Sequence, residues 1–141
     1  MAAGDTADAD EVDRARWHLP RKIESIPDGR HLVRLLALCV FGQGDCADRA
    51  QLCASELLTN ALVHGAGPNI RLTVATTSTA FRVTIHDDGG TGRIVAPGHD
   101  DLDCRRVNNG RGLFLVDAMA DRWRASQPRH RGTTVWFEID L

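Results

Sequence analysis

The sequence predicts an α+β fold, a two-layer α/β sandwich in which helices cover one face of a mixed, largely antiparallel sheet. Apolar residues recur first at helical spacing and later in strict alternation, which is the pattern of helices followed by strands. The chain has 141 residues, of which 43% are hydrophobic and 26% are charged. This balance is typical of one soluble globular domain, in which helices and sheet share a single core.

Two helices are expected in the first half of the chain. A strand over about 14–26 leads into a Pro-Asp-Gly turn, in which Asp28 can cap the first helix. Two glycines interrupt the apolar pattern of this helix. Asp45 can cap a second helix, which runs to about His64, where a further glycine-rich stretch ends it.

The second half of the chain is expected to consist mainly of strands. Alternation on both sides of a turn near 77–79 predicts a hairpin. Its apolar positions are Ile70, Leu72, Val74, Phe81, Val83 and Ile85. Residues 88–109 are rich in glycine and aspartate without periodicity, as in a functional lid. Gly110 is expected to open a third helix, and strands beginning at Trp123 and including Phe137 close the domain.

Charge is distributed unevenly along the chain. The net charge is −2, but residues 1–13 hold five of the 19 acidic residues, which leaves 14 acidic against 17 basic residues over 14–141. We expect a disordered acidic tail over 1–13 and one domain over 14–141. Direct nucleic-acid binding is not expected, because it requires a concentrated positive surface. No signal peptide or membrane span is found, so we expect a cytoplasmic protein.

Glu56 and Asn60 are the first candidate functional residues. They lie four residues apart in the second expected helix and therefore stack on one of its faces, beside an apolar arc. This spacing places a carboxylate and an amide at the margin of the core. Ordinary surface helices often carry such pairs, so the pair alone does not identify a site.

Asp87 is the second candidate. It continues the alternation of the apolar residues in its strand, so its side chain is expected to face the core. An inward carboxylate needs a hydrogen-bonding partner, because burying it unpaired is costly. Asp88 has the opposite orientation, and the two glycines that follow it permit a tight turn or a close backbone approach.

The third candidate is the segment Asn-Asn-Gly-Arg-Gly-Leu over 108–113. Free backbone N–H groups at a helix start, together with the helix dipole, suit a phosphate. The segment is neither a Walker A loop nor a Rossmann fingerprint, since no Gly-Lys-Ser/Thr follows it and no βαβ unit surrounds it.

Taken in this order, the three candidates resemble the motifs of the GHKL ATP-binding superfamily, whose fold is of the Bergerat type. ELLTNALVHG is similar to its N box, DDGG to its first glycine box and NNGRGLFLV to its second. The short chain and the segments GLFLVDAMADRW and GTTVWFEI resemble the anti-sigma-factor serine/threonine kinases of bacterial partner-switching systems. The resemblance covers about residues 15–141.

The resemblance implies a role for each candidate residue. Asp87 would accept a hydrogen bond from the exocyclic amine of adenine, Asn60 would be a ligand of Mg²⁺, and Glu56 would be the general base. The other implied nucleotide contacts are Gly89, Thr91, Gly110, Arg111, Gly112 and Leu113.

One departure from the superfamily pattern concerns the first glycine box, which usually reads Asp-x-Gly-x-Gly. With Asp87 as its aspartate, Thr91 stands in place of the last glycine. A register one residue later restores the pattern but makes Asp88 the adenine ligand, and strand orientation favours Asp87. The charged residues within 100–106 have no assigned role and are interpreted as a solvated run.

The function that the resemblance implies is that of an enzyme. It would bind ATP and Mg²⁺, phosphorylate an anti-anti-sigma (STAS) protein, sequester a sigma factor, and could form a homodimer. One alternative is an ATP-binding module that grips a protein partner without phosphotransfer, and another is a detached histidine-kinase catalytic domain. The presence of both Glu56 and Asn60 favours the enzyme, because a binding module needs no base.

Overall fold

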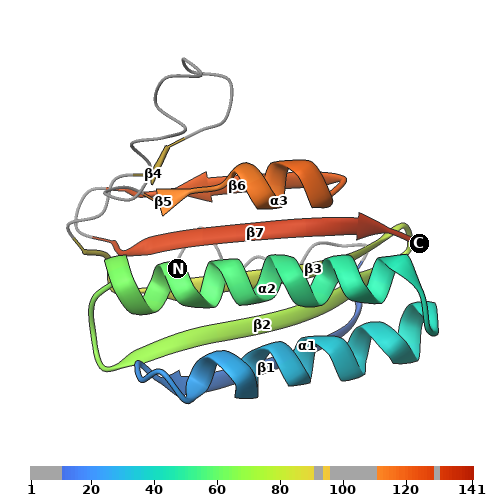
Figure 1. The fold of residues 1–141 in the computed structure, drawn as a ribbon, viewed down its shortest axis with the longest axis horizontal. Helices are drawn as coiled ribbons and strands as arrows, with labels where there is room; N and C mark the ends of the chain where they lie inside the picture. Colours follow the sequence, from blue (N-terminus) through green and yellow to red (C-terminus); the bar gives the residue numbers. More distant parts are fainter. Residues whose placement is uncertain (1–10, 91–93, 96–110, 129–130) are drawn as a thin grey trace.

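The fold has two layers, a five-stranded sheet and a layer of helices on one of its faces (Figure 1). The computed structural model describes residues 11–90, 94–95, 111–128 and 131–141. In chain order the elements are β1 (Glu11–Pro20), α1 (Ser25–Phe41), α2 (Asp45–His64), β2 (Asn69–Thr77), β3 (Ala80–Asp87), β4 (Ile94–Val95), β5 (Arg111–Gly112), α3 (Phe114–Met119), β6 (Arg122–Ser126) and β7 (Thr133–Asp140). The predicted α+β sandwich is confirmed.

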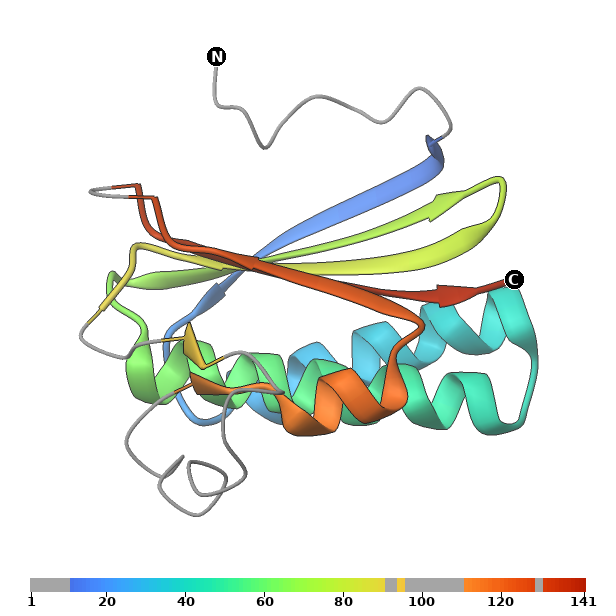
Figure 2. The ribbon, with the colours of Figure 1, turned by 90° about the horizontal axis from the view of Figure 1, so that it is seen from above.

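All neighbouring strands of the sheet are antiparallel, in the order β1-β2-β3-β7-β6. A separate short pair, β4–β5, is the only parallel pairing within the described ranges. The last strand, β7, lies between β3 and β6, so the final strand completes the interior of the sheet. Figure 2 shows that α1, α2 and α3 all lie on the same side of the sheet.

The core lies between the sheet and α2. All six apolar positions of the predicted hairpin are buried, which confirms its alternation. Paired residues form rows that cross all five strands, and one such row is Trp17, Leu72, Ile85, Val135 and Ala125. On the other layer, α2 buries mainly small side chains together with Leu57 and Leu58, so the helix can approach the sheet closely.

The predicted Pro-Asp-Gly turn is wrong, because Pro27, Asp28 and Gly29 lie inside α1, which begins at Ser25. A proline is tolerated in the first turn of a helix, where backbone N–H groups have no intrahelical partner. Gly29 is buried, and a Cβ atom on it would stand 2.7 Å from Cδ1 of Leu58. The glycine therefore serves the packing of α1 on α2, and Asp28 is not the helix cap.

Other boundaries also differ from the prediction. Strand β1 begins at Glu11, inside the expected tail, and ends at Pro20 instead of extending to 26. Residues 1–10 lie outside the described part of the chain. The third helix begins at Phe114, after the short strand β5, and not at Gly110. No helix in the described ranges is long and apolar enough to cross a membrane.

Arg21, directly after β1, connects the end of that strand to the end of α2. Its Nε donates a hydrogen bond of 2.8 Å to the carbonyl of Gly67, and its Nη1 donates one of 2.8 Å to the carbonyl of Leu62. Its own N–H donates to the carbonyl of Pro68. A cation at the C-terminal end of a helix also interacts favourably with the helix dipole. Arg21 therefore fixes the loop that follows α2.

We expect Arg21→Ala to lower the free energy of unfolding by about 2 kcal/mol, because two carbonyl groups lose a charged donor. Lys22→Ala is the matched control, since Lys22 is the exposed neighbour of Arg21, and it should change the stability by less than about 0.5 kcal/mol. Urea unfolding measures both values, and equal losses in the two variants would contradict the role of Arg21.

Candidate functional site

The second helix, α2, carries Glu56 and Asn60 on its half-buried margin. The Nδ2 atom of Asn60 is buried and has no hydrogen-bond partner within the described structure. Such a group costs roughly 1–3 kcal/mol unless a ligand or a water accepts its hydrogens. The buried amide of Asn60 therefore has unused hydrogen-bonding capacity at the margin of α2.

Burial raises the pKa of Glu56 above its ordinary value. Partial removal from water disfavours the ionised form, so this carboxylate holds a proton more tightly than an exposed glutamate. Cys53, one turn earlier, is fully buried, and burial raises the pKa of its thiol to about 12. Arg49 opposes this rise and Glu56 adds to it. Cys53 is thus a thiol at neutral pH and packs as a small apolar side chain.

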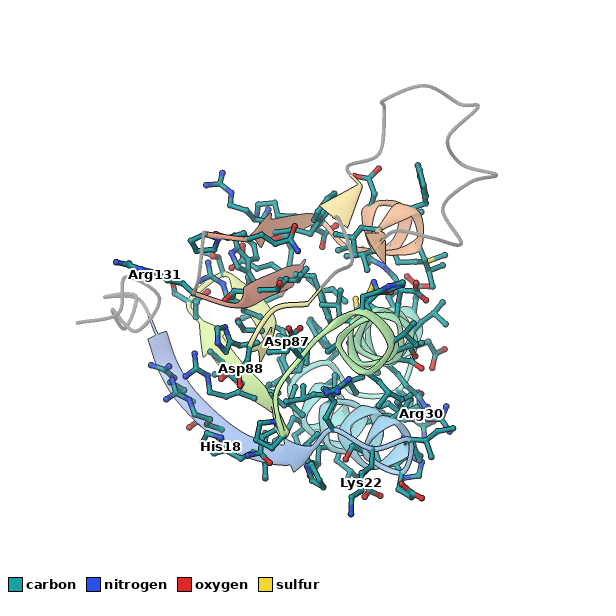
Figure 3. All side chains as sticks on the ribbon, turned by 90° about the vertical axis from the view of Figure 1, so that its left-hand side faces the viewer. His18, Lys22, Arg30, Asp87, Asp88 and Arg131 are labelled. Carbon is teal, nitrogen blue, oxygen red and sulfur yellow. The ribbon has the colours of Figure 1, made fainter. Side chains whose placement is uncertain are left out.

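Asp87 ends strand β3 with its side chain facing the core, and it is only 2% exposed. Its Oδ1 atom accepts a hydrogen bond of 2.7 Å from the N–H of Gly89. Asp88, by contrast, is exposed. The predicted orientations of the two aspartates are therefore confirmed, and Figure 3 shows Asp87 between α2 and the sheet.

Glycines surround the two aspartates at close range. A Cβ atom on Gly65 would stand 2.7 Å from Cγ of Asp87, and one on Gly67 would overlap the carboxylate of Asp88. A Cβ atom on Gly132 would overlap the backbone oxygen of Asp87, and Gly132 has a φ of +82°. Backbone thus packs directly against this end of β3, which only glycine permits.

The loop after α2 and the start of β7 were not among the predicted site residues. Gly65 ends the segment ELLTNALVHG and Gly132 begins the segment GTTVWFEI, but neither glycine was given a role at the site. The signal that could have identified Gly132 is its position directly before a strand, in the segment GTTVWFEI. Register then places Thr133 opposite Asp87, which a local pattern does not reveal.

The second glycine box is described only in part. Gly110 of this box lies outside the described residues. The same holds for Thr91 of the first glycine box and for the charged residues within 100–106. The backbone of Arg111 and Gly112 forms β5, beside Ile94 and Val95 of β4. Leu113 is fully buried in the core, so its side chain is part of the packing.

Arg49 fixes the position of α3 next to α2. Its Nε donates a hydrogen bond of 2.6 Å to the carbonyl of Met119, and its Nη2 lies 3.3 Å from Oδ1 of Asp121. A hydrogen bond from the N–H of Asp140 is the largest cause that lowers the pKa of Asp121, and Arg49 adds to it. These contacts join α2, α3 and β7, and no local pattern indicated them.

Comparisons with known proteins identify the family of this fold. Residues 19–139 match the family described as the histidine kinase-like ATPase domain. The match covers most of the chain, so the chain belongs to this family and its resemblance to the GHKL superfamily is confirmed. No curated protein matches the sequence.

Two solved structures match this chain, and the first of them shares its fold. The RsbU and RsbW domains of a Mycobacterium tuberculosis protein match with a TM-score of 0.68 and 16% identity, over 91% of this chain and 32% of that chain. A histidine kinase domain from the blue-light activated histidine kinase of Erythrobacter litoralis matches with a TM-score of 0.46 and 23% identity, over 82% of this chain and 61% of that chain. The present chain thus spans about a third of the first structure.

We expect Gly65→Ala to weaken the binding of a non-hydrolysable ATP analogue at least about tenfold, or roughly 1.4 kcal/mol. The added methyl group would collide with the backbone oxygen of Ala61 and stand 2.7 Å from Cγ of Asp87, so the end of α2 and the carboxylate would both have to shift. Isothermal titration calorimetry measures the affinity. Val63→Ala is the control, since Val63 is 63% exposed and lies two residues away. Unchanged affinity in Gly65→Ala would contradict this expectation.

Proposed function

We propose that this histidine kinase-like ATPase domain binds Mg-ATP at the junction of α2 and β3 and acts as an anti-sigma-factor serine/threonine kinase. It would sequester a sigma factor and phosphorylate an anti-anti-sigma (STAS) protein. The observation that carries the proposal is the inward, buried carboxylate of Asp87 at one end of a helix whose margin presents Asn60 and Glu56.

The residues at the end of β3 suit an adenine. A carboxylate accepts hydrogen bonds, so Asp87 can bind the exocyclic amine of adenine and reject guanine, which has an acceptor at that place. The glycines around Asp87 leave no side chain between the backbone and a flat base. Gly65 directly follows α2 and lies against Asp87, so the C-terminal end of this helix is the end near the adenine. Along α2 from that end, Asn60 comes first and Glu56 follows one turn further away.

Asn60 would bind the ion and the phosphates. Its amide supplies an oxygen ligand of the kind that Mg²⁺ takes, and its buried Nδ2 donors lack a partner in the described structure. When bound, ATP would supply the γ-phosphoryl group, and Mg²⁺ would offset part of the negative charge of the phosphates. We assign the backbone of Gly89, Thr91, Gly110, Arg111, Gly112 and Leu113 to the remaining nucleotide contacts, on the strength of the motif resemblance.

Glu56 would orient the attacking hydroxyl and accept its proton. Its raised pKa makes it a stronger base than an exposed glutamate. Only the ionised form can accept a proton, so transfer should decline as the pH falls through the raised pKa of Glu56.

The proposed partners follow from the motifs of the second glycine box and of the C-terminal segment. The fold that this chain shares with a structure containing an RsbW domain supports them. A phosphate adds roughly −1.5 to −2 charges to the antagonist and would weaken its docking, which leaves the kinase free to bind the sigma factor.

We expect Asp87→Asn to weaken ATP binding about 100-fold, because the buried amide presents a donor toward the adenine amine. Asp88→Asn should change the affinity less than about twofold, since Asp88 is exposed. Calorimetric titration with ATP and GTP measures both affinity and base preference. A large loss of ATP affinity in Asp88→Asn with little change in Asp87→Asn would instead make Asp88 the adenine ligand.

We expect Glu56→Gln to bind ATP normally and to lose phosphotransfer to a STAS protein, measured with radiolabelled ATP. Folding raises the pKa of Glu56, so its contribution to stability is lost as the pH rises through that value. The variant should therefore melt at a higher temperature than the wild type at pH 7 and show no gain at pH 4.

Three outcomes would count against the kinase. If the wild type binds ATP but labels no partner, and Glu56→Gln behaves in the same way, the chain is a binding module. Label that is lost in acid would indicate phosphohistidine and a histidine-kinase type of chemistry. Melting of Glu56→Gln far below the wild type would make the residue structural.

A further inference from the structure

Helix α3 is too short to hold its own position. It comprises the six residues Phe114–Met119, and isolated helices of that length are not stable in water. Contacts with the rest of the fold must therefore hold it. Leu113, directly before the helix, and Val116 within it are fully buried in the core. These two side chains fix the start and the middle of α3, and Arg49 of α2 contacts its end.

Arg49 caps the C-terminal end of α3. The carbonyl of Met119 belongs to the last turn of this helix, where carbonyl groups have no intrahelical donor. Nε of Arg49 donates a hydrogen bond of 2.6 Å to this carbonyl. A cation at this end also interacts favourably with the helix dipole. Figure 2 shows α3 in the same layer as α2, so the contact joins two neighbouring helices.

The guanidinium of Arg49 also contacts Asp121, which is tied to the sheet. Nη2 of Arg49 lies 3.3 Å from Oδ1 of Asp121. Oδ2 of Asp121 accepts a hydrogen bond of 2.7 Å from the N–H of Asp140, and the N–H of Asp121 donates one of 2.9 Å to the carbonyl of Glu138. The side chain of Arg49 is 21% exposed, so water screens these contacts only in part. Arg49 thus holds the junction of α3 and β6 from the side of α2.

The position of α3 determines where the second glycine box lies. The chain runs from β5, Arg111–Gly112, through one buried residue directly into α3. A shift of this helix would therefore move the backbone of β5. The other half of α2 carries Asn60, so this helix supports one part of the candidate site directly and the other part through Arg49 and α3.

We propose that Arg49 is a positioning residue of the nucleotide site. By holding α3 against α2, it keeps the backbone of Arg111–Gly112 at a fixed distance from Asn60. The inference rests on the proposed function, because that function assigns both groups to the phosphates and the ion of Mg-ATP. Groups that bind one ligand from two separate elements must be held in place by their supporting contacts. Arg49 supplies this support without being assigned a contact to the nucleotide.

Arg34 offers a matched comparison on the other side of the same helix. Its Nη1 donates a hydrogen bond of 2.8 Å to Oδ1 of Asp48 and one of 2.8 Å to Oε1 of Gln51, and so joins α1 to α2. Consecutive residues of a helix point about 100° apart, so Asp48 and Arg49 face different neighbours. Loss of Arg34 therefore breaks a comparable pair of contacts and leaves the contacts of α3 intact.

Hydrogen exchange of the nucleotide-free chain tests the anchoring by itself. The reporters are the N–H groups of Asp117 and Ala120, which donate to the carbonyls of Leu113 and Val116. Arg49→Ala should speed their exchange at least about tenfold, because the end of α3 opens locally. Arg34→Ala should change it less than about twofold, because its contacts lie on α1.

Calorimetric titration with a non-hydrolysable ATP analogue and Mg²⁺ then tests the positioning. Arg49→Ala should weaken binding about tenfold, as the loss of a supporting partner does, and Arg34→Ala less than about twofold. Arg49→Lys keeps a cation but loses the planar fork, so its affinity should lie between the wild type and Arg49→Ala. Asp121→Asn keeps an acceptor for the N–H of Asp140 and removes the charge that faces Arg49. Because the two residues act together, Arg49→Ala/Asp121→Asn should bind no more weakly than Arg49→Ala.

Each contrary result has its own meaning. A wild type that binds no ATP analogue would refute the proposed function, and the role of Arg49 with it. If the wild type binds, equal losses of affinity in Arg49→Ala and Arg34→Ala would refute the role of Arg49 alone. Unchanged exchange in Arg49→Ala would do the same, and faster exchange with unchanged affinity would make Arg49 a structural residue only. Circular dichroism verifies the fold, and Arg49→Lys replaces Arg49→Ala in both measurements if the latter does not fold.

Discussion

The interior position of the Asp87 carboxylate is the constraint on which the rest of this site depends. A carboxylate at the end of a central strand must be hydrogen-bonded and closely surrounded, and Gly89 supplies one donor. The chain meets this requirement with backbone, since Gly65 and Gly132 lie where any side chain would collide. The end of α2 and the start of β7 are therefore placed by what Asp87 requires, and Arg21 holds the first of them in position.

The helix α2 serves the core and the candidate site at the same time. Its buried face consists largely of small residues, so the helix packs closely on the sheet, and its C-terminal end lies near Asp87 at the end of β3. Asn60 and Glu56 lie on this margin, and their partial burial follows from the packing. The same burial produces the unsatisfied amide and the raised carboxyl pKa, so core packing and site chemistry share a single cause.

The comparison of sequence and structure separates local from long-range information. Alternation predicted β2, β3 and the inward Asp87 correctly because burial along a strand is a local property. The turn at Pro27-Asp28-Gly29 was wrong because turn residues were overridden by the packing of Gly29 on Leu58. Arg21 and Arg49 act over 46 and 70 residues, and the insertion of β7 beside β3 has no periodic signal, so neither could be predicted from spacing.

The position of β7 has a consequence for how the molecule is made. Synthesis proceeds from the N-terminus, and residues 133–140 are produced after every other strand of the sheet. Until they leave the ribosome, β3 has one unpaired side, β6 has no neighbour in the sheet, and Asp87 lacks the strand opposite it. A nascent chain can build α1 and α2 and pair β1, β2 and β3, and β7 joins the sheet after them. Premature termination would therefore leave an exposed strand edge for chaperones and proteases to recognise.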